Sequence, residues 1–246
     1  MPTPASDNPR WRLAEQITDA VRRRFSADVL AVGVHGALAH GDDHEDSEVN
    51  LVAVTHRPHT GPRPATRRID GLVVDLGVIA SEEYLGHART LSTGWPLAAD
   101  QYLTTAGTFD PDGWYEVLRD THLGRLAEAP TSEFTALARE AWYDAYTAHA
   151  QARRLAIWHD PDAALVALSA ARVGAAVVDG LLTRTYFRDT PDAVRRTGLA
   201  GMPLPELAAR LADQAAELTR RGRAVDGHID DLFLPMPLTP IPLPIR

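Results

Sequence analysis

Residues that could do chemistry gather in residues 29–54. A short, β-branched apolar run ends in a glycine-rich turn that contains His35 and His40. An acidic segment follows, and Glu48 and Asn50 then lead into a second apolar run. A strand, a glycine turn and carboxylates that enter the next strand form an arrangement that can bind phosphate and a divalent metal. The segment therefore predicts a ligand site between two strands.

A further carboxylate, Asp75, lies inside the apolar run of residues 72–79. An unpaired carboxylate in a sheet is costly unless it is hydrogen-bonded, bound to a ligand or solvated. Alternation puts Asp75 on the face of Val73 and Gly77, and puts Val74 and Leu76 on the other. Two interpretations of Asp75 are therefore open: it belongs to the ligand site, or its side chain points to solvent.

Acid–base chemistry is the other use of these residue types. His35 and His40 carry imidazoles that titrate near neutrality, although both also fit ordinary turns. Glu140 and Asp144 are one helical turn apart, and a carboxylate pair on so apolar a helix is more often functional or hydrogen-bonded than idle. The acids of residues 42–46 are most simply a solvated loop.

Composition sets further bounds. The chain has 246 residues, enough for one large or two small domains, and its net charge of −8 argues against a general nucleic-acid binder. It lacks cysteine, so thiolate chemistry is excluded. All 25 basic residues are arginine, so no lysine can bind phosphate. We see no signal peptide and no run of 18 apolar residues, and we expect a cytoplasmic protein without a membrane span.

Hydrophobic periodicity places these residues on strands and helices. We predict an α/β (α+β) fold: a mixed sheet at residues 1–125, a helical bundle at residues 126–234 and a proline-rich tail at residues 235–246. The predicted strands are residues 29–34, 49–55, 72–79 and, less regularly, 98–108, with a loop at residues 56–68. The predicted helices are residues 11–24, 82–90 (capped by Ser81), 114–126, 133–158 and 163–185, a short helix after residue 190, and residues 203–222.

Several short motifs occur in an order that resembles a known family. They are GALAH at residues 36–40, SEVN at residues 47–50, VVDLG around Asp75, TGWPLAADQY at residues 93–102 and REAWYDAYTA at residues 139–148. Together the N-terminal half resembles the nucleotidyltransferase superfamily with the polymerase-β-type palm. Within it, the chain is most similar to the aminoglycoside 4'-nucleotidyltransferases, the kanamycin nucleotidyltransferases. The resemblance covers most of residues 10–160.

The resemblance implies Mg²⁺, a nucleoside triphosphate and a homodimer whose cleft is lined by both subunits. It also implies roles for individual positions, and five of these depart from the family's pattern. The family's phosphate-contacting Ser and Arg are replaced by Ala37 and His40, and its two metal carboxylates by the longer Glu48 and the neutral Asn50. The lysine expected one turn after the general-base position, Asp144, is Ala148.

Three functions follow from this degenerate metal and phosphate motif. The first is an enzyme of the nucleotidyltransferase fold that acts on a small polar, amino-sugar-like molecule in antibiotic resistance or biosynthesis. The second is a metal-independent acid–base enzyme in the same cleft, and the third is a non-catalytic binding or scaffold protein. Mg²⁺ and a nucleoside triphosphate are needed only by the inherited nucleotidyl transfer. The expected partners are a small-molecule substrate and a second copy of the chain, without nucleic acid or membrane.

The candidate site residues fall into three groups. The catalytic candidates are Asp144, Glu48, Asp75 and His40. The substrate-binding candidates are His35, Gly36, Ala37, Asn50, Glu82 and Glu140. A metal, if one binds, would use Glu48 and Asp75.

Overall fold

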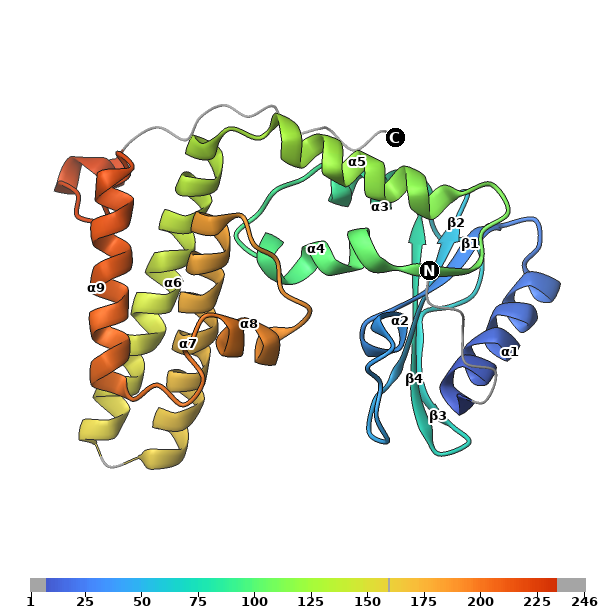
Figure 1. Cartoon of the computed structure of the whole chain (residues 1–246), viewed down its shortest axis with the longest axis horizontal. Helices are drawn as coiled ribbons and strands as arrows, with labels where there is room; N and C mark the ends of the chain where they lie inside the picture. Colours follow the sequence, from blue (N-terminus) through green and yellow to red (C-terminus); the bar gives the residue numbers. More distant parts are fainter. Residues whose placement is uncertain (1–7, 159, 234–246) are drawn as a thin grey trace.

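The computed structural model describes residues 8–158 and 160–233. A mixed sheet and a helical bundle lie side by side, and helix α4 (Trp95–Thr104) lies between them (Figure 1). The predicted α/β class, with strands first and a bundle after them, is therefore confirmed.

The sheet has five strands in the order β3-β4-β2-β1-β5. Strands β2 and β4 are parallel, and the other neighbouring pairs are antiparallel. The parallel pair places the middle of β4 beside the start of β2, so residues from separate motifs become neighbours. The strands are β1 (Val29–His35), β2 (Val49–Thr55), β3 (Ala65–Ile69), β4 (Leu72–Ala80) and β5 (Ala106–Phe109).

Helices cover both faces of the sheet. Helix α1 (Pro9–Arg24) buries Leu13 and Val21 against one face, where Val74 is also buried. Helices α3 (Ser81–Ala88) and α5 (Trp114–Glu128) cover the other face around Val52 and Val54. Alternation sets the two faces, because successive side chains of a strand point in opposite directions.

The bundle buries a second apolar core between long helices. These are α6 (Thr131–Ile157), α7 (Pro161–Thr183) and α9 (Leu204–Arg220), with the shorter α8 (Thr190–Arg196) and a 3₁₀ turn at Ile229–Phe233. Trp95 and Ala99 of α4 pack into the same core. Helix α4 is thus tied to the bundle at one end, and the boundary placed at residue 125 lies inside α5.

Three local predictions were wrong. Residues 65–69 form strand β3, which pairs with β4, because the turn at Asp70 and Gly71 closes a hairpin. Residues 95–104 form helix α4, because Pro96 stands in its first turn, where a missing N–H costs nothing. Ser81 does not cap α3, since its Oγ accepts a hydrogen bond from Trp114 Nε1 (3.1 Å). The predicted proline-rich tail lies outside the described residues.

Among the described residues, one helix, α7, is long and apolar enough to cross a membrane by length and composition. Its two charged residues past the first turn, Arg172 and Asp179, both contact neighbouring parts of the bundle. Arg172 donates to the Met202 carbonyl, and Asp179 pairs with Arg210 and accepts from Gln214. These contacts satisfy the charged side chains of α7 within the bundle, as expected for a helix of a bundle core.

Candidate functional site

Three of the predicted site residues stand in one row across the sheet. His35 of β1 pairs with Asn50 of β2, and Asn50 pairs with Asp75 of β4. Paired residues on neighbouring strands point to the same face about 4.8 Å apart, so the row spans about 10 Å. Thr66 of β3 extends it and donates its hydroxyl to Asp75. We call His35, Asn50 and Asp75 the polar row.

The polar row lies where the helical cover of its face ends. The same face carries Val52 and Val54 further along β2, and α3 and α5 cover these. His35, Asn50 and Asp75 are each partly exposed. The face predicted for Asp75 is confirmed, since Val74 on the opposite face is buried under α1.

A glycine opens the turn beside the row. Gly36 has φ +71°, a conformation that glycine adopts at little cost, and an added Cβ would stand 3.4 Å from Asn50 Nδ2. The chain can therefore leave β1 sharply and enter the short helix α2 (Ala37–His40). The turn joins His35 to α2, and His40 at the end of α2 contacts Asp100, whose charge also acts on His35.

The electrostatics of the row centre on His35. Burial lowers the pKa of His35 from its ordinary value, and the nearby carboxylates of Asp75 and Asp100 act in the opposite direction. The imidazole is therefore neutral at pH 7 and can accept a proton. None of the described residues forms a hydrogen bond with its ring nitrogens, so both are available to a ligand.

His40 at the end of α2 contacts a buried carboxylate of α4. Its Nε2 lies 3.0 Å from each carboxylate oxygen of Asp100, which is 4% exposed. Asp100 thereby connects the sheet domain to the helix that enters the bundle core. Its negative charge also acts to raise the pKa of His35, against the larger effect of burial, so the same carboxylate interacts with both histidines.

The acidic loop between α2 and β2 is held at both ends. Arg10, which is 7% exposed, donates to the carbonyls of Ser47 (2.9 Å) and Glu45 and pairs with Asp43 (3.7 Å). Asp42 pairs with Arg188 of the α7–α8 connection, so the loop also contacts the bundle half. The prediction of a solvated loop was therefore wrong at Asp43, whose side chain is 9% exposed, whereas Asp42 is exposed as predicted.

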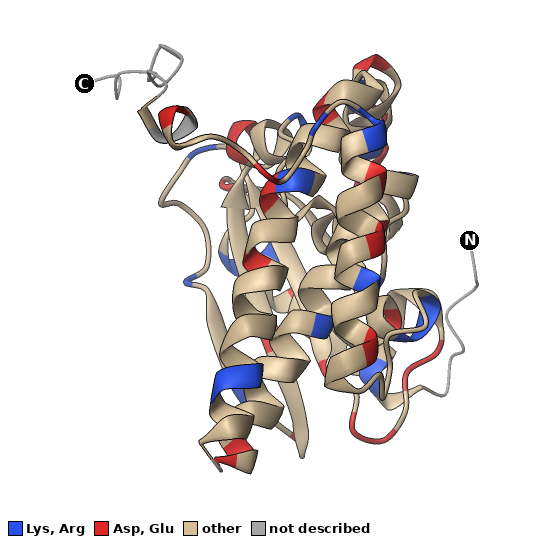
Figure 2. Ribbon diagram, turned by 90° about the vertical axis from the view of Figure 1, so that its left-hand side faces the viewer, with Lys and Arg blue, Asp and Glu red and all other residues tan. Residues whose placement is uncertain are grey.

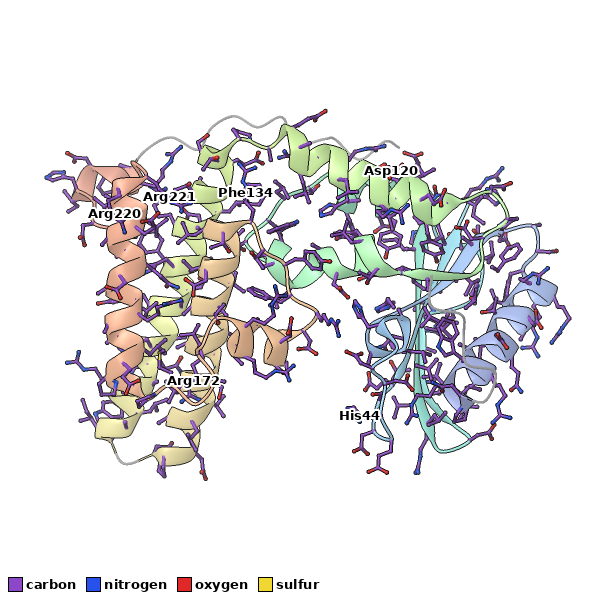
Figure 3. All side chains as sticks on the ribbon, viewed as in Figure 1. His44, Asp120, Phe134, Arg172, Arg220 and Arg221 are labelled. Carbon is purple, nitrogen blue, oxygen red and sulfur yellow. The ribbon has the colours of Figure 1, made fainter. Side chains whose placement is uncertain are left out.

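Acidic and basic residues alternate along the helices and loops in the view of Figure 2, without a large region of one sign. His44 lies at the exposed outer end of the loop, away from the sheet (Figure 3).

A two-metal centre does not fit the residues at the row. Asn50 is neutral, Glu48 is exposed just outside β2, and Asp75 accepts a hydrogen bond from Thr66. Within residues 8–158 and 160–233, no group of three His, Asp or Glu side chains converges as a metal site would require. Mg²⁺ prefers several anionic or carbonyl oxygens in octahedral geometry, and Glu48 and Asp75 do not supply them.

Three predicted site residues lie away from the row within one chain. Glu82 is exposed in α3, beyond the end of β4, and the strand puts about 17 Å between Asp75 and that end. Glu140 is exposed on α6 and pairs with its neighbour Arg139. Asp144 is exposed on α6 and makes no hydrogen bond or ion pair with any described residue.

Sequence reasoning missed Asp100 and Arg10. Asp100 was missed because residues 98–108 were predicted to be a strand. In the helix that actually starts at Trp95, Asp100 lies on the buried side with Ala99. Arg10 is one of 25 arginines, and nothing in its spacing separates it from the exposed Arg12.

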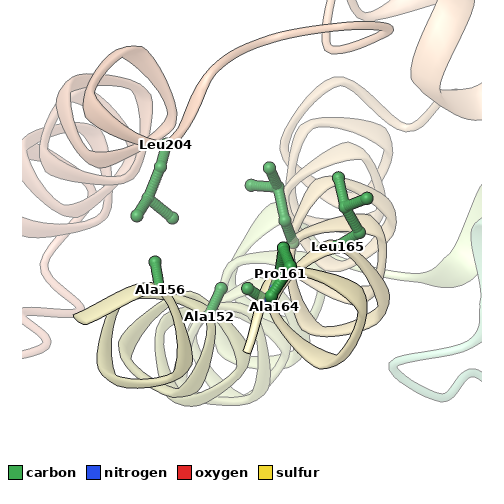
Figure 4. A pocket seen from close by; sticks show the side chains of 7 residues that line it. Ala152, Ala156, Pro161, Ala164, Leu165 and Leu204 are labelled. Carbon is green, nitrogen blue, oxygen red and sulfur yellow. The ribbon is translucent and has the colours of Figure 1, made fainter. Parts of the chain in front are cut away.

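A separate pocket of about 540 Å³ opens at the distal end of the bundle (Figure 4). Its lining is apolar and carries no titratable group, so it offers no acid–base or phosphate chemistry. It is lined by Ala152, Ala156, Pro161, Ala164, Leu165, Leu168 and Leu204.

No protein-family model matches the chain. An aminoglycoside nucleotidyltransferase (4') from Staphylococcus aureus is 23% identical over 130 residues, covering 50% of this chain and 47% of the relative. One from Bacillus sp is 22% identical over 120 residues, covering 46% and 44%. The chain thus spans about half the length of the curated relatives it matches.

A nucleotidyltransferase-like protein from Exiguobacterium sibiricum 255-15 has a crystal structure with a TM-score of 0.44 and 15% identity, covering 84% of this chain and 75% of that one. Over about half of its length, the chain is distantly similar in sequence to the aminoglycoside 4'-nucleotidyltransferases.

Proposed function

We propose that this chain is a cytoplasmic enzyme of the nucleotidyltransferase fold that acts on a small polar molecule by proton transfer at the polar row. The observation that carries the proposal is the convergence of His35, Asn50 and Asp75 on adjacent strands. A neutral His35 accepts a proton from a substrate hydroxyl, the Asn50 amide orients the substrate, and Asp75 binds its cationic group. None of these roles needs a metal ion.

The charges around the row favour an amine over a triphosphate. Asp75 and Glu48 are acidic, and the chain has no lysine. The two arginines that contact the adjoining loop, Arg10 and Arg188, are both engaged by its acids. An ammonium group beside Asp75 gains a charge-assisted hydrogen bond, whereas a triphosphate would meet two carboxylates. A polyhydroxylated amine of the amino-sugar type is therefore the proposed substrate class, in resistance or biosynthesis.

The inherited nucleotidyl transfer is the second candidate, and the similarity to two curated aminoglycoside nucleotidyltransferases favours it. It would require Mg²⁺ and a nucleoside triphosphate, held through Glu48 and Asp75 with a neutral amide at Asn50. It would also require His40 in place of a permanent, bidentate guanidinium. A non-catalytic binding protein would use the same row without turnover.

We also propose a homodimer in which Asp144 enters the cleft of the second copy. Within one chain Asp144 is exposed and has no partner among the described residues, which leaves it free to contact another subunit. Light scattering should give about twice the monomer mass of 26.8 kDa. A monomer at micromolar concentration would contradict this assignment.

Calorimetry with kanamycin A as the probe tests the proposed substrate class. In EDTA, wild-type protein should bind kanamycin A, and Asp75→Asn should weaken binding by about 10- to 100-fold, since a hydrogen bond to a charged group contributes about 1.5–3 kcal/mol. The exposed Asp120→Asn on α5 is the matched control and should bind like wild type. Binding that is absent in EDTA but appears with Mg²⁺ and ATP would contradict the metal-independent function.

Mass spectrometry of an aminoglycoside and aminocyclitol panel tests the reaction. Product formation in EDTA should be lost in His35→Gln while binding persists, because the proton acceptor is removed and Asp75 is not. An adenylated product formed with ATP and Mg²⁺ would establish the second candidate instead.

A further inference from the structure

The contact between His40 and Asp100 has the form of an acid–base dyad. The imidazole Nε2 lies 3.0 Å from both carboxylate oxygens, and 15% of the His40 side chain and 6% of the Asp100 side chain are exposed. The carboxylate is thus nearly shielded from water, whereas the imidazole keeps an open edge. The two residues come from different elements, α2 and α4.

This geometry selects one form of the imidazole. An ionised carboxylate only accepts hydrogen bonds, so the nitrogen that faces it must carry the hydrogen. In neutral His40, Nε2 is therefore protonated and Nδ1 carries the lone pair. None of the described residues forms a hydrogen bond with this Nδ1.

Asp100 is suited to hold that form. Its backbone is fixed in the middle of α4, where its carbonyl accepts a hydrogen bond from Thr104 Oγ1 (2.8 Å). Ala99 beside it is buried in the bundle core, so the helix cannot easily turn the carboxylate away. A buried carboxylate also needs a hydrogen-bond donor, and among the described residues His40 supplies it.

We propose that Asp100, whose charge acts on both His35 and His40, is a positioning residue that fixes His40 as the Nε2–H tautomer and so presents Nδ1 as a second proton acceptor beside the polar row. The inference rests on the proposed function and adds a residue pair to it. In the transfer, a substrate O–H bond breaks, the proton forms an N–H bond at Nδ1, and the electron pair stays on oxygen. The imidazolium lies beside Asp100 until the proton is returned to the substrate.

Nitrogen NMR of the ligand-free chain separates this role from a structural cross-link. In protein labelled with ¹⁵N-histidine, the neutral form of the His40 imidazole should carry its hydrogen on Nε2 and a lone pair on Nδ1. Asp100→Asn should give a mixture of tautomers, because an amide can either donate or accept. His40→Gln assigns the signals, and Asp120→Asn removes a remote, exposed acid and should leave the tautomer unchanged.

Two results would overturn the inference: a neutral His40 with its hydrogen on Nδ1 in the wild type, or an unchanged single tautomer in Asp100→Asn. Circular dichroism at 222 nm shows that each variant is folded. If Asp100→Asn does not fold, the wild-type tautomer and its response to ligand still decide the matter.

Titration with kanamycin A then tests the role in the cleft. The His40 Nδ1 signal should shift on binding in the wild type. A shift at His35 without one at His40 Nδ1 would overturn this inference and leave the proposed function standing. A response at neither histidine would instead count against the proposed function.

Discussion

Replacing Arg10 with methionine should loosen the acidic loop and lower the stability of the sheet domain. The guanidinium is buried, and it bonds the carbonyls of Ser47 and Glu45 and pairs with Asp43. Methionine keeps the apolar stem of the side chain and removes all three contacts. The loop leads directly into β2, so the position of Asn50 in the polar row depends on it.

The size of the effect follows from these contacts. A hydrogen bond from a charged donor contributes about 1.5–3 kcal/mol, and two of them face carbonyls of the loop. Glu45 is exposed, so water can replace part of its lost hydrogen bond, and we therefore expect each bond to contribute near the lower end of this energy range. Asp43 also keeps its hydrogen bonds from Asn8 (3.0 and 3.2 Å). We expect Arg10→Met to reduce the free energy of unfolding by about 2–4 kcal/mol.

Urea unfolding followed by circular dichroism measures this loss. Arg12→Met is the matched control, because Arg12 lies in the same helix and is exposed; its effect should stay below about 0.5 kcal/mol. Equal effects of the two substitutions would refute the argument that Arg10 holds the loop. Arg10→Met should also weaken kanamycin A binding, since Asn50 is no longer fixed.

Three further predictions concern other parts of the molecule. His122 accepts a hydrogen bond from Trp95 Nε1 and contacts the Ala88 carbonyl, and its burial lowers its pKa. Below pH 6.5 the unfolded chain therefore takes up a proton at this histidine that the folded chain does not. Acidification from pH 7 to 5.5 should therefore lower the free energy of unfolding through this group, and His122→Gln should show a shallower pH dependence. Gly33→Ala should reduce the free energy of unfolding by about 1–3 kcal/mol, because the new Cβ would lie 2.6 Å from Thr105 Cγ2. Gly77→Ala is the control: its Cβ would lie 3.6 Å from the Leu51 carbonyl oxygen, so urea unfolding should show a smaller loss. Asn50→Asp places a second carboxylate beside Asp75, so Mn²⁺ should raise its melting temperature and leave the wild type unchanged; equal shifts would contradict the account of the metal site.

Much of the fold was predictable because its signals are local. The β-branched runs around Val32, Val52 and Val74 predict strands, and the helices after residue 110 begin at recognisable turns and Pro or Asp residues. The errors arose where tertiary contacts outweigh local preference. Residues 65–69 look like a polar loop and become a strand because β4 offers them a hydrogen-bonding edge.

The amino-acid sequence by itself determined the identity of the polar row. It supplied Asn50 and Asp75 on two predicted strands and His35 in the turn directly after a third. It also showed a neutral amide at Asn50 and a histidine at His40, where the resembled family has a carboxylate and a guanidinium. Side-chain alternation even fixed the face of Asp75. These properties follow from residue type and from spacing along one chain.

Only the tertiary structure decided which residues meet. The parallel register of β2 and β4 places Asn50 beside Asp75, and the packing of α4 on the bundle brings Asp100 to His40 across 60 positions of sequence. It also left Glu82, Glu140 and Asp144 away from the row within one chain. Such pairings depend on how separate elements pack against shared cores, and the periodicity of a single segment does not encode them.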